Sequence, residues 1–308
     1  MGYSTWCLAI FLVIAGCSTS PKEPVPLPYL LLNEAKPDTI PAVFAPGFIS
    51  MPDRYEFGIT ISRDGNEIFF GVDPIFDLQT PGVHQIWRSS FEQGEWSEPR
   101  IFLSHPEFTR NDPMFSNDDQ RLYFISNQPL KGNEKKDIDL WYIQNEGGTW
   151  SEPINAGHTI NSEFDEFYSS FTTDGSMYFA SNAGKFDSTR SRNYNIYKAR
   201  FDDGEYKEPI ALSDSINTGY YEGDVFVAPD ESYLIFAAGR RGGLGRGDLY
   251  ISFKNKAGTW TKAKNMGELI NSEHHELCPY VSPDGKTFFY TSNKELLWVS
   301  TEIFERYR

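Results

Sequence analysis

Short runs of aromatic and β-branched residues alternate with polar turns along most of the chain. Runs such as Ile68-Phe69-Phe70 and Leu122-Tyr123-Phe124 lie a few residues after a turn, and a second run such as Leu249-Tyr250 follows in each copy. Runs of this kind favour β-strands, and no segment between them has the period of an amphipathic helix. The pattern therefore predicts an all-β protein built from antiparallel strands.

Two turn motifs show that these strands belong to a repeat. The first motif contains an aspartate, and the successive aspartates are 54, 56, 56 and 54 residues apart: Asp64, Asp118, Asp174, Asp230 and Asp284. The second motif keeps the same spacing and begins at Trp96, Trp150, Tyr206 and Trp260. Four short strands in about 55 residues is the size of one propeller blade. We predict a β-propeller with repeats at about 55–108, 109–164, 165–220, 221–274 and 275–301.

The two ends of the repeat region determine the number of blades. The last repeat lacks a fourth strand, whereas the run Ile40 to Phe44 precedes the first repeat and has no blade of its own. Strands from both ends of a chain can close a propeller and remove an exposed edge. We predict that residues 39–308 form five four-stranded blades closed by an N-terminal strand. Six blades are the alternative, with residues 39–54 and 302–308 in a further partial sheet.

The repeat has recognisable elements beyond its period. The Ser-Pro-Asp-Gly turn at 282–285, the Ser-Asn pair at 126–127 and the Asp-Leu-Tyr run at 248–250 resemble the WD-like propeller repeat of the TolB type. The resemblance covers nearly the whole region after residue 38 and implies the propeller fold. That family includes periplasmic scaffold propellers, propellers attached to peptidases and many lipoproteins, so the resemblance implies no single activity.

The N-terminal segment indicates a location. The apolar stretch Leu8 to Ala15 is too short to span a bilayer, and it leads into Ile14-Ala15-Gly16-Cys17, which resembles a bacterial lipobox. The resemblance implies that residues 1–16 are a lipoprotein signal peptide and that Cys17 is the lipidation site. Residues 17–38 are rich in proline and polar residues and predict an extended tether. We expect a bacterial outer-membrane lipoprotein that faces either the periplasm or the exterior.

The net charge excludes one class of partner, and the cysteine content indicates the state of the thiols. The formal net charge is −15, which repels phosphate backbones, so we expect no nucleic-acid partner. After processing at Cys17, Cys278 is the one remaining cysteine; its apolar neighbours favour a buried structural thiol. Three arginines between Arg240 and Gly247 could hold an anionic group, but without a strand-to-helix context we interpret this segment as a solvated loop. We predict a monomer without a cofactor.

The order of strands within a blade separates two faces of the ring. Alternate connections of an up-and-down sheet lie at the same end, so the tight turns share one face and the long loops 72–84, 128–137, 183–193 and 239–247 share the other. Eight residues before each turn aspartate, near the long-loop face, stands an ionisable residue. With two histidines these residues form our candidate binding face: Glu56, Arg110, Glu166, Glu222, Glu276, His274 and His275.

Two interpretations of this ring of carboxylates remain open. It could bind a ligand at the mouth of a central channel, or each glutamate could accept hydrogen bonds from the neighbouring blade's backbone, which is the role we favour for a residue present in nearly every repeat. No fixed ligand spacing is present, so we assign no metal site. Because Asp bonds its own backbone in turns, we interpret the five turn aspartates as turn formers and not as catalytic groups.

These observations favour a lipid-anchored binding or scaffold module. Its partner would be a glycan, a peptide or an envelope protein, and it would meet the membrane through lipid on Cys17. The alternative is a carbohydrate-active enzyme, a glycosidase or lyase, that uses the channel-mouth carboxylates. No single blade shows an extra acidic residue that breaks the pattern. We therefore favour a non-enzymatic protein and assign no catalytic residue.

Overall fold

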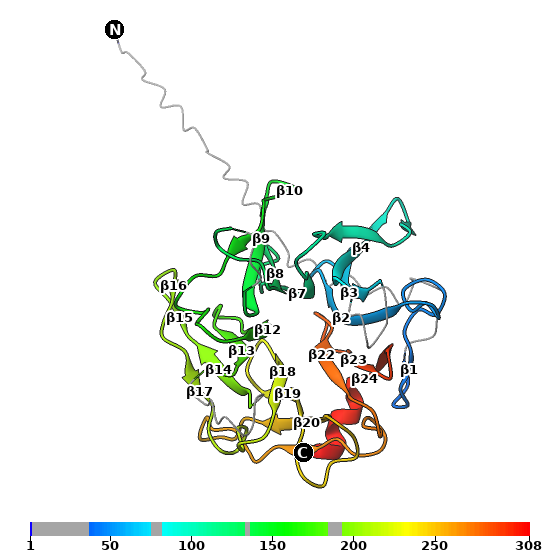
Figure 1. Cartoon of the computed structure of the whole chain (residues 1–308), viewed down its shortest axis with the longest axis vertical. Helices are drawn as coiled ribbons and strands as arrows, with labels where there is room; N and C mark the ends of the chain where they lie inside the picture. The colour runs from blue at the N-terminus through cyan, green and yellow to red at the C-terminus, as the bar shows by residue number, and fades with distance from the viewer. Residues whose placement is uncertain (2–36, 75–81, 133–135, 184–192) are drawn as a thin grey trace.

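The computed structural model describes residues 1, 37–74, 82–132, 136–183 and 193–308. Five antiparallel sheets form a ring around a central axis (Figure 1). The first three blades run from the inner to the outer strand as β2 (Tyr55–Ile61), β3 (Glu67–Asp73), β4 (Gln85–Glu92) and β6 (Arg100–Leu103); β7 (Asn111–Phe115), β8 (Arg121–Ser126), β9 (Asp139–Glu146) and β11 (Ile154–Asn155); and β12 (Glu166–Phe171), β13 (Met177–Ser181), β14 (Asn195–Ala199) and β17 (Ile210–Ala211).

The last two blades complete the ring. They consist of β18 (Glu222–Val227), β19 (Tyr233–Ala238), β20 (Asp248–Phe253) and β21 (Lys264–Asn265), and of β22 (Leu277–Val281), β23 (Thr287–Ser292), β24 (Glu295–Ser300) and β1 (Ala42–Val43). Short strands extend the outer hairpins of the first three blades: β5 (Glu95–Trp96), β10 (Thr149–Trp150), β15 (Phe201–Asp202) and β16 (Glu205–Tyr206). The predicted five-bladed propeller is confirmed.

The N-terminal strand closes the ring as predicted. Strand β1 pairs antiparallel with β24, with Ala42 opposite Trp298 and Val43 opposite Leu297. The next residue, Phe44, donates its backbone N–H to the carbonyl of Leu296 at 2.8 Å, and its ring packs edge-on against Phe289 with ring centroids 5.0 Å apart. The closing strand is therefore held by backbone pairing and by an aromatic contact.

The C-terminal residues do not form the partial sheet of the six-bladed alternative. Residues Thr301–Tyr307 form the 3₁₀-helix η1, capped by the Ser300 hydroxyl, which accepts a hydrogen bond from the backbone N–H of Glu302. The helix buries Ile303 and Phe304, and Phe304 packs against Tyr233 of the fourth blade and Phe288 of the fifth. The chain end thus seals the joint between these two blades.

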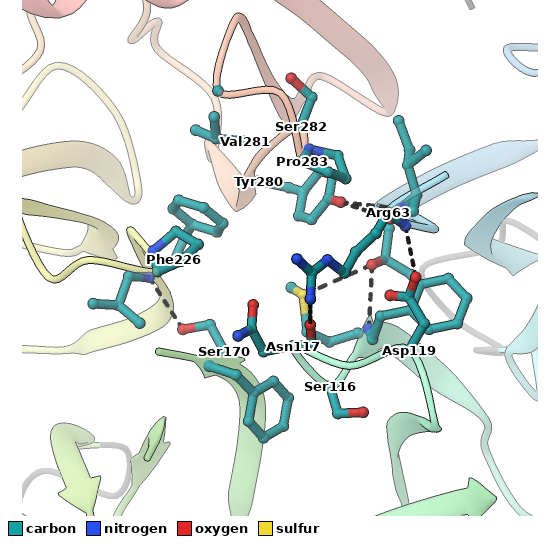
Figure 2. Close-up of a pocket in the computed structure, with 18 of the residues that line it drawn as sticks. Arg63, Ser116, Asn117, Asp119, Ser170, Phe226, Tyr280, Val281, Ser282 and Pro283 are labelled. Atoms are coloured by element: carbon teal, nitrogen blue, oxygen red, sulfur yellow. Dashed lines mark hydrogen bonds between the residues drawn. The ribbon is translucent and has the colours of Figure 1, made fainter. Parts of the chain in front are cut away.

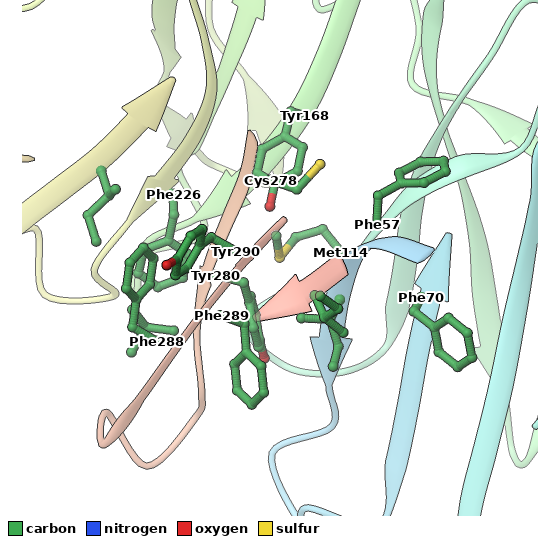
Figure 3. Close-up of a cluster of buried hydrophobic side chains, with 14 of the residues drawn as sticks. Phe57, Phe70, Met114, Tyr168, Phe226, Cys278, Tyr280, Phe288, Phe289 and Tyr290 are labelled. Atoms are coloured by element: carbon green, nitrogen blue, oxygen red, sulfur yellow. The ribbon is translucent and has the colours of Figure 1, made fainter. Parts of the chain in front are cut away.

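Large aromatic side chains fill the space between neighbouring blades. The residue five positions after each turn aspartate is at most 3% exposed: Phe69, Tyr123, Phe179, Ile235 and Phe289. Around the axis the packed side chains come from several blades, with Met114, Tyr280 and Phe226 grouped together in Figure 3. Each large side chain of this kind contributes about 1.5–3 kcal/mol when fully buried. The aromatic residues therefore serve the core.

Every innermost strand carries a β-bulge at the same position. The strand register shifts between Phe57 and Ile59 in the first blade and at the equivalent place in the other four. The bulged residues all have φ between 46° and 52°: Gly58, Asp112, Tyr168, Asp224 and Cys278. Positive φ is unfavourable for residues with a side chain and recurs where structure or function requires it. These five residues face one another near the axis.

The turn aspartates act locally, as predicted. Asp174 Oδ1 accepts hydrogen bonds from the Thr172 hydroxyl and from the Ser176 backbone N–H at 3.0 Å, and the equivalent aspartates bond the residue two positions on in the same way. In the first three blades the residue before the aspartate instead reaches the next blade. Arg63 Nη1 donates to the Asn117 carbonyl at 2.7 Å, and the Thr173 hydroxyl donates to the Pro229 carbonyl at 2.9 Å.

A charged cluster joins the third and fourth blades. The carboxylate of Glu231 accepts hydrogen bonds from Lys198 Nζ and Lys254 Nζ, both at 2.6 Å, and from the Tyr178 hydroxyl. Burial of the carboxylate opposes ionisation, but these three donors outweigh it and lower the pKa of Glu231 to about 2. The ion pairs are therefore present across the physiological pH range.

The predicted signal peptide, the lipidation site Cys17 and most of the tether lie outside the described residues, as do parts of three long loops, 75–81, 133–135 and 184–192. Within the described part of the chain, no helix has the length and apolar character needed to cross a bilayer.

Candidate functional site

The predicted ring of carboxylates lies inside the blades. Each ring residue stands at the start of an inner strand or just before it, and each is at most 3% exposed: Glu56, Arg110, Glu166, Glu222 and Glu276. His274 and His275 follow the last blade connection and are half-buried. The five ring residues therefore occupy one equivalent position in the fold, as their common offset predicts. They are not open to solvent at the mouth of a channel.

Hydroxyl groups within the same blade hold these carboxylates. Glu166 accepts hydrogen bonds from the Ser162 hydroxyl at 2.6 Å, the Ser162 backbone N–H at 2.9 Å and the Ser181 hydroxyl at 2.7 Å. Glu276 accepts from the Ser272 and Ser292 hydroxyls, both at 2.6 Å. Burial raises the pKa of Glu166 to about 6, although the hydroxyl donors oppose the shift.

Glu222 and Glu56 each form an ion pair with an arginine. Glu222 accepts from the Thr218 hydroxyl and forms an ion pair with Arg240 Nε at 3.1 Å, and Glu56 is paired with Arg54 and accepts from the Met51 backbone N–H. Burial raises the pKa of both glutamates, and in each case the arginine partner lowers it in part. The carboxylates therefore join each incoming connection to its blade.

Arg110 replaces glutamate in the second blade and is equally enclosed. Its guanidinium donates to the Ser126 hydroxyl, to the Gln128 side-chain oxygen and to the Thr109 carbonyl at 3.1 Å, and it lies 5.5 Å from the centre of the Phe124 ring. Burial lowers the pKa of Arg110 to about 10. Arg110 binds its own blade and is not a positive group at the rim.

An asparagine in three blade connections precedes the hydroxyl residue that bonds the ring glutamate. Asn161 Oδ1 accepts from the Leu140 backbone N–H at 2.9 Å while its Nδ2 donates to the Leu140 carbonyl at 2.9 Å; Asn217 clamps Ile196 and Asn271 clamps Leu249 in the same manner. The residue after each asparagine is the serine or threonine that bonds the ring glutamate. We did not predict this connector, although the run Asn-(Ser/Thr)-x-x-x-Glu at 161–166, 217–222 and 271–276 makes it visible in the sequence.

The geometry favours the structural role, with partners different from those we expected. The donors are mainly hydroxyls of the incoming connection and of the same blade, rather than backbone groups of the neighbouring blade. Ligand binding by the ring stays a prediction. Among the described residues, no group of three or more His, Cys, Asp and Glu side chains is arranged to hold a metal ion.

The Glu166→Gln substitution tests this structural role. The new amide has one acceptor oxygen in place of two, so we expect the free energy of unfolding to fall by about 1–3 kcal/mol and the melting temperature to fall by several degrees. The matched control is Glu163→Gln, three residues earlier and exposed, which should leave the melting temperature unchanged. Thermal unfolding followed by circular dichroism measures both. An unchanged melting temperature for Glu166→Gln, relative to the parent protein, would contradict the structural role and favour ligand binding by this carboxylate.

An aromatic pocket of about 420 Å³ opens on the long-loop face. We call this cavity the aromatic pocket. Its lining residues are Phe167, Tyr194, Tyr221, Arg246 and His275. They come from the third, fourth and fifth blades and from the connections between them. Successive rings stand nearly perpendicular, with Phe167 and Tyr194 at 80° and Tyr194 and Tyr221 at 81°. We predicted His275 as a candidate binding residue and discussed Arg246 as part of a basic loop, but the three remaining residues were not predicted.

A buried acidic pair lies near the axis, beside this pocket. Asp112 and Asp224 are 8% and 6% exposed, and Cys278 lies between them: its backbone N–H donates to Asp224 Oδ2 at 3.3 Å, and its thiol lies 3.8 Å from Asp112 Oδ1. Burial, together with the charge of Asp224, raises the pKa of Asp112 to about 8. Burial also raises the pKa of Asp224 to about 6. The predicted burial of Cys278 is confirmed.

Tyrosines link the acidic pair to the aromatic pocket. Burial and the charges of Asp224 and Asp112 raise the pKa of Tyr221, so its hydroxyl lies within electrostatic reach of the pair. On the axis, the Tyr168 hydroxyl donates to the Pro279 carbonyl at 2.9 Å, and the ring of Tyr168 lies beside Cys278 in Figure 3. The pair is nonetheless more than nine-tenths buried, so it gives the glycosidase alternative no pair of accessible carboxylates.

The turn face is also hollowed, which the sequence did not predict. A cavity of about 130 Å³ lies at the axis, and Figure 2 shows side chains of all five blades around it, including Arg63, Ser170, Phe226 and Tyr280. A wider groove of about 820 Å³ continues from it between the second and third blades. Arg63 crosses this region and donates its backbone N–H to Asp119 Oδ2 at 2.7 Å. Many of the polar groups here already bond the neighbouring blade.

Comparisons with known proteins agree with this architecture. No protein-family model matches the chain, and no curated protein is detectably similar to it in sequence. A protein of unknown function from Dyadobacter fermentans superposes with a TM-score of 0.51 at 14% identity, over 86% of this chain and 83% of that one. TolB from Agrobacterium tumefaciens superposes with a TM-score of 0.50 at 14% identity, over 78% of this chain and 70% of that one.

TolB from Acinetobacter baumannii is a further neighbour, with a TM-score of 0.47 at 14% identity over 81% of this chain and 55% of that one. The superposition on the Agrobacterium protein, at a TM-score of 0.50, shows that the chain has a TolB-like propeller fold. At these identities the likeness concerns the fold, and the function must be argued from the site.

Proposed function

We propose that the protein is a lipid-anchored module of the bacterial cell envelope that binds a glycan, a peptide or an envelope protein through its long-loop face. The aromatic pocket is the observation that carries this proposal. It places four rings and a guanidinium around one opening on the face where the loops are longest. Pockets with aromatic walls and a few polar groups are the usual form of a ligand site.

The location rests on the sequence Ile14-Ala15-Gly16-Cys17 and on the Pro-rich stretch that follows it. A lipid on Cys17 would tether the propeller to the membrane. An enzymatic function has weaker support, because the acidic residues that repeat from blade to blade are buried and bonded within the protein. We therefore propose that the protein acts by binding a partner.

A photo-crosslinking experiment in intact cells tests face and anchor together. A photoreactive residue is placed at Leu130, an exposed position on the long-loop face, or at Lys256, an exposed position in an outer hairpin on the turn face. We expect a discrete crosslinked envelope component from position 130 and none from position 256. In the Cys17→Ser background we expect no incorporation of labelled fatty acid and loss of the crosslink, because the domain is no longer held at the membrane.

Two results would contradict the proposal. One is a crosslink of equal yield from both faces, which would show that the long-loop face has no special role. The other is unchanged membrane partitioning of the Cys17→Ser variant with normal removal of residues 1–16, which would exclude the lipid anchor.

A further inference from the structure

The loop that carries Arg246 is docked onto the next blade connection. Its backbone N–H at Arg246 donates to the His274 carbonyl at 2.8 Å, and the Glu276 backbone N–H donates to the Gly247 carbonyl at 2.9 Å. The carboxylate of Asp248 accepts from the backbone N–H groups of Leu244 and Gly245 at 2.8 and 2.9 Å. This segment is therefore docked at its end, while Arg241, Leu244 and Arg246 are exposed, as expected for a solvated loop.

Two glycines make this docking possible. A Cβ atom at Gly245 would lie 2.1 Å from the His274 carbonyl oxygen, and one at Gly247 would lie 2.3 Å from the His275 ring. Any side chain at these two positions would push the loop away from the connection. The glycines thus serve a close approach of two backbones rather than flexibility.

The arginines of the loop have different roles. Arg240 is committed to the fold, because it pairs with Glu222 and lies 4.5 Å from the centre of the Tyr250 ring. Arg246 is exposed and lines the aromatic pocket, and within the described residues it has no carboxylate partner at ion-pair distance. Arg241 is exposed on the same loop without lining the pocket. Arg246 is therefore the cation available to a ligand there.

The histidine of the pocket packs against the loop that carries Arg246. Burial, followed by the nearby positive charge of Arg246, lowers the pKa of His275. Its Nε2 atom is buried and has no hydrogen-bond partner among the described residues. A Cβ atom at Gly247 would lie 2.4 Å from this nitrogen, so Nε2 faces the glycine backbone and the His275 ring serves as one wall of the pocket.

We propose that the aromatic pocket binds a sugar that carries a carboxylate, such as a uronic acid residue of an acidic glycan. This inference rests on the binding function proposed above and names its ligand class. The planar guanidinium of Arg246 matches a carboxylate in a two-point contact. The faces of the tyrosine and phenylalanine rings match the apolar faces of a pyranose ring. The imidazole ring of His275 contributes a further aromatic wall.

Charge and shape distinguish this ligand from the alternatives. The net charge of −15 repels anions at long range, so a preference for a carboxylate must come from direct contact with Arg246. An extended peptide is usually recognised through backbone pairing with a free strand edge. The pocket is instead lined by side chains of β12 and of the segments that lead into β14, β18, β20 and β22. A compact ring with hydroxyl groups is the better match.

Calorimetric titration of the full chain with three trisaccharides tests the proposal. The probes are trigalacturonic acid, its methyl ester and neutral galactotriose. We expect trigalacturonic acid to bind at least about 10-fold more tightly than the two neutral probes, the effect of one charge-assisted contact of roughly 1.4 kcal/mol. The Arg246→Gln substitution should remove this preference, whereas the matched control Arg241→Gln, with the same change in net charge, should retain it.

Thermal unfolding of both variants shows whether they fold normally, which we expect because both side chains are exposed. Equal affinity for the charged and neutral probes, equal loss in the two arginine variants, or no binding of any probe would overturn the proposal. Tighter binding of triglutamate than of trigalacturonic acid would also overturn it, in favour of an acidic peptide. A crosslink from position 130 that persists in any of these cases would leave the binding function standing without this ligand.

Discussion

Deleting residues 39–54 will abolish cooperative folding of the propeller. The segment supplies β1, the outer strand of the fifth blade, and buries Phe44, Ala45 and Ile49 at 4%, 0% and 0% exposure. Burial of the two large side chains alone contributes about 3–6 kcal/mol, which is comparable to the whole stability of an ordinary domain, about 5–15 kcal/mol. The deletion also leaves β24 with an unpaired edge, so we expect aggregation at micromolar concentration.

Thermal unfolding and gel filtration of the truncated chain measure this effect. The matched control removes residues 18–36, a Pro-rich stretch of similar length, and should leave the melting temperature unchanged. The control ends before Asp38 because the Asp38 carbonyl accepts a hydrogen bond from the Ser300 backbone N–H at 2.9 Å. A stable monomer that begins at Tyr55 would show that ring closure contributes little.

The fold was largely predictable because the repeat can be recognised from the sequence motifs. The turn aspartates and the tryptophan motifs recur in one register, and each blade needs the same hairpins to bury the same aromatic residue. The closing strand was predictable because the last repeat lacks a fourth strand, whereas a strand-like run before the first repeat has no blade of its own. The 3₁₀-helix η1 was not, because its seven residues are too few to show a helical period.

The candidate site was predicted less well, for a physical reason. A common offset of eight residues correctly places the ring glutamates at one equivalent position, but it cannot tell whether a side chain faces a channel or packs inside a blade. The hydroxyl residue four positions before three of the four glutamates, Ser162, Thr218 or Ser272, carried that information. A carboxylate with a hydroxyl donor built into the same repeat is already satisfied and does not need a ligand.

The axial acidic pair could not be predicted from strand alternation. The bulges at Asp112 and Asp224 insert a residue with positive φ, which turns these side chains out of the alternating pattern and toward the axis. A shift of one residue moves a side chain to the opposite face of a strand. Two of the five blades have a carboxylate at this position, whereas the others have Gly, Tyr or Cys, so the repeat did not mark it.

Replacing Asp112 by asparagine will raise the melting temperature at pH 8 and have little effect near pH 4. Burial and the charge of Asp224 raise the pKa of Asp112 to about 8 from an ordinary value of 3.8. Between these two pH values the folded protein holds a proton that the unfolded chain releases. The free energy of unfolding therefore falls as the pH rises through this window. Each unit of pKa difference corresponds to about 1.4 kcal/mol, so the effect at pH 8 is on the order of several kcal/mol.

Asparagine is a suitable probe because it has nearly the shape of aspartate, carries no charge and tolerates positive φ. The matched control is Asp174→Asn in a turn, where a hydrogen bond from the Thr172 hydroxyl lowers the pKa of Asp174. That change should have the opposite sign, lowering the melting temperature at pH 8 and losing its effect as the pH falls through the folded pKa. Thermal unfolding of both variants and the parent between pH 4 and pH 8 separates the two signs. A destabilised Asp112→Asn variant at pH 8 would mean that the carboxylate is ionised and held by partners, whereas a stabilised one would mark it as a residue retained at the expense of stability, as functional groups often are.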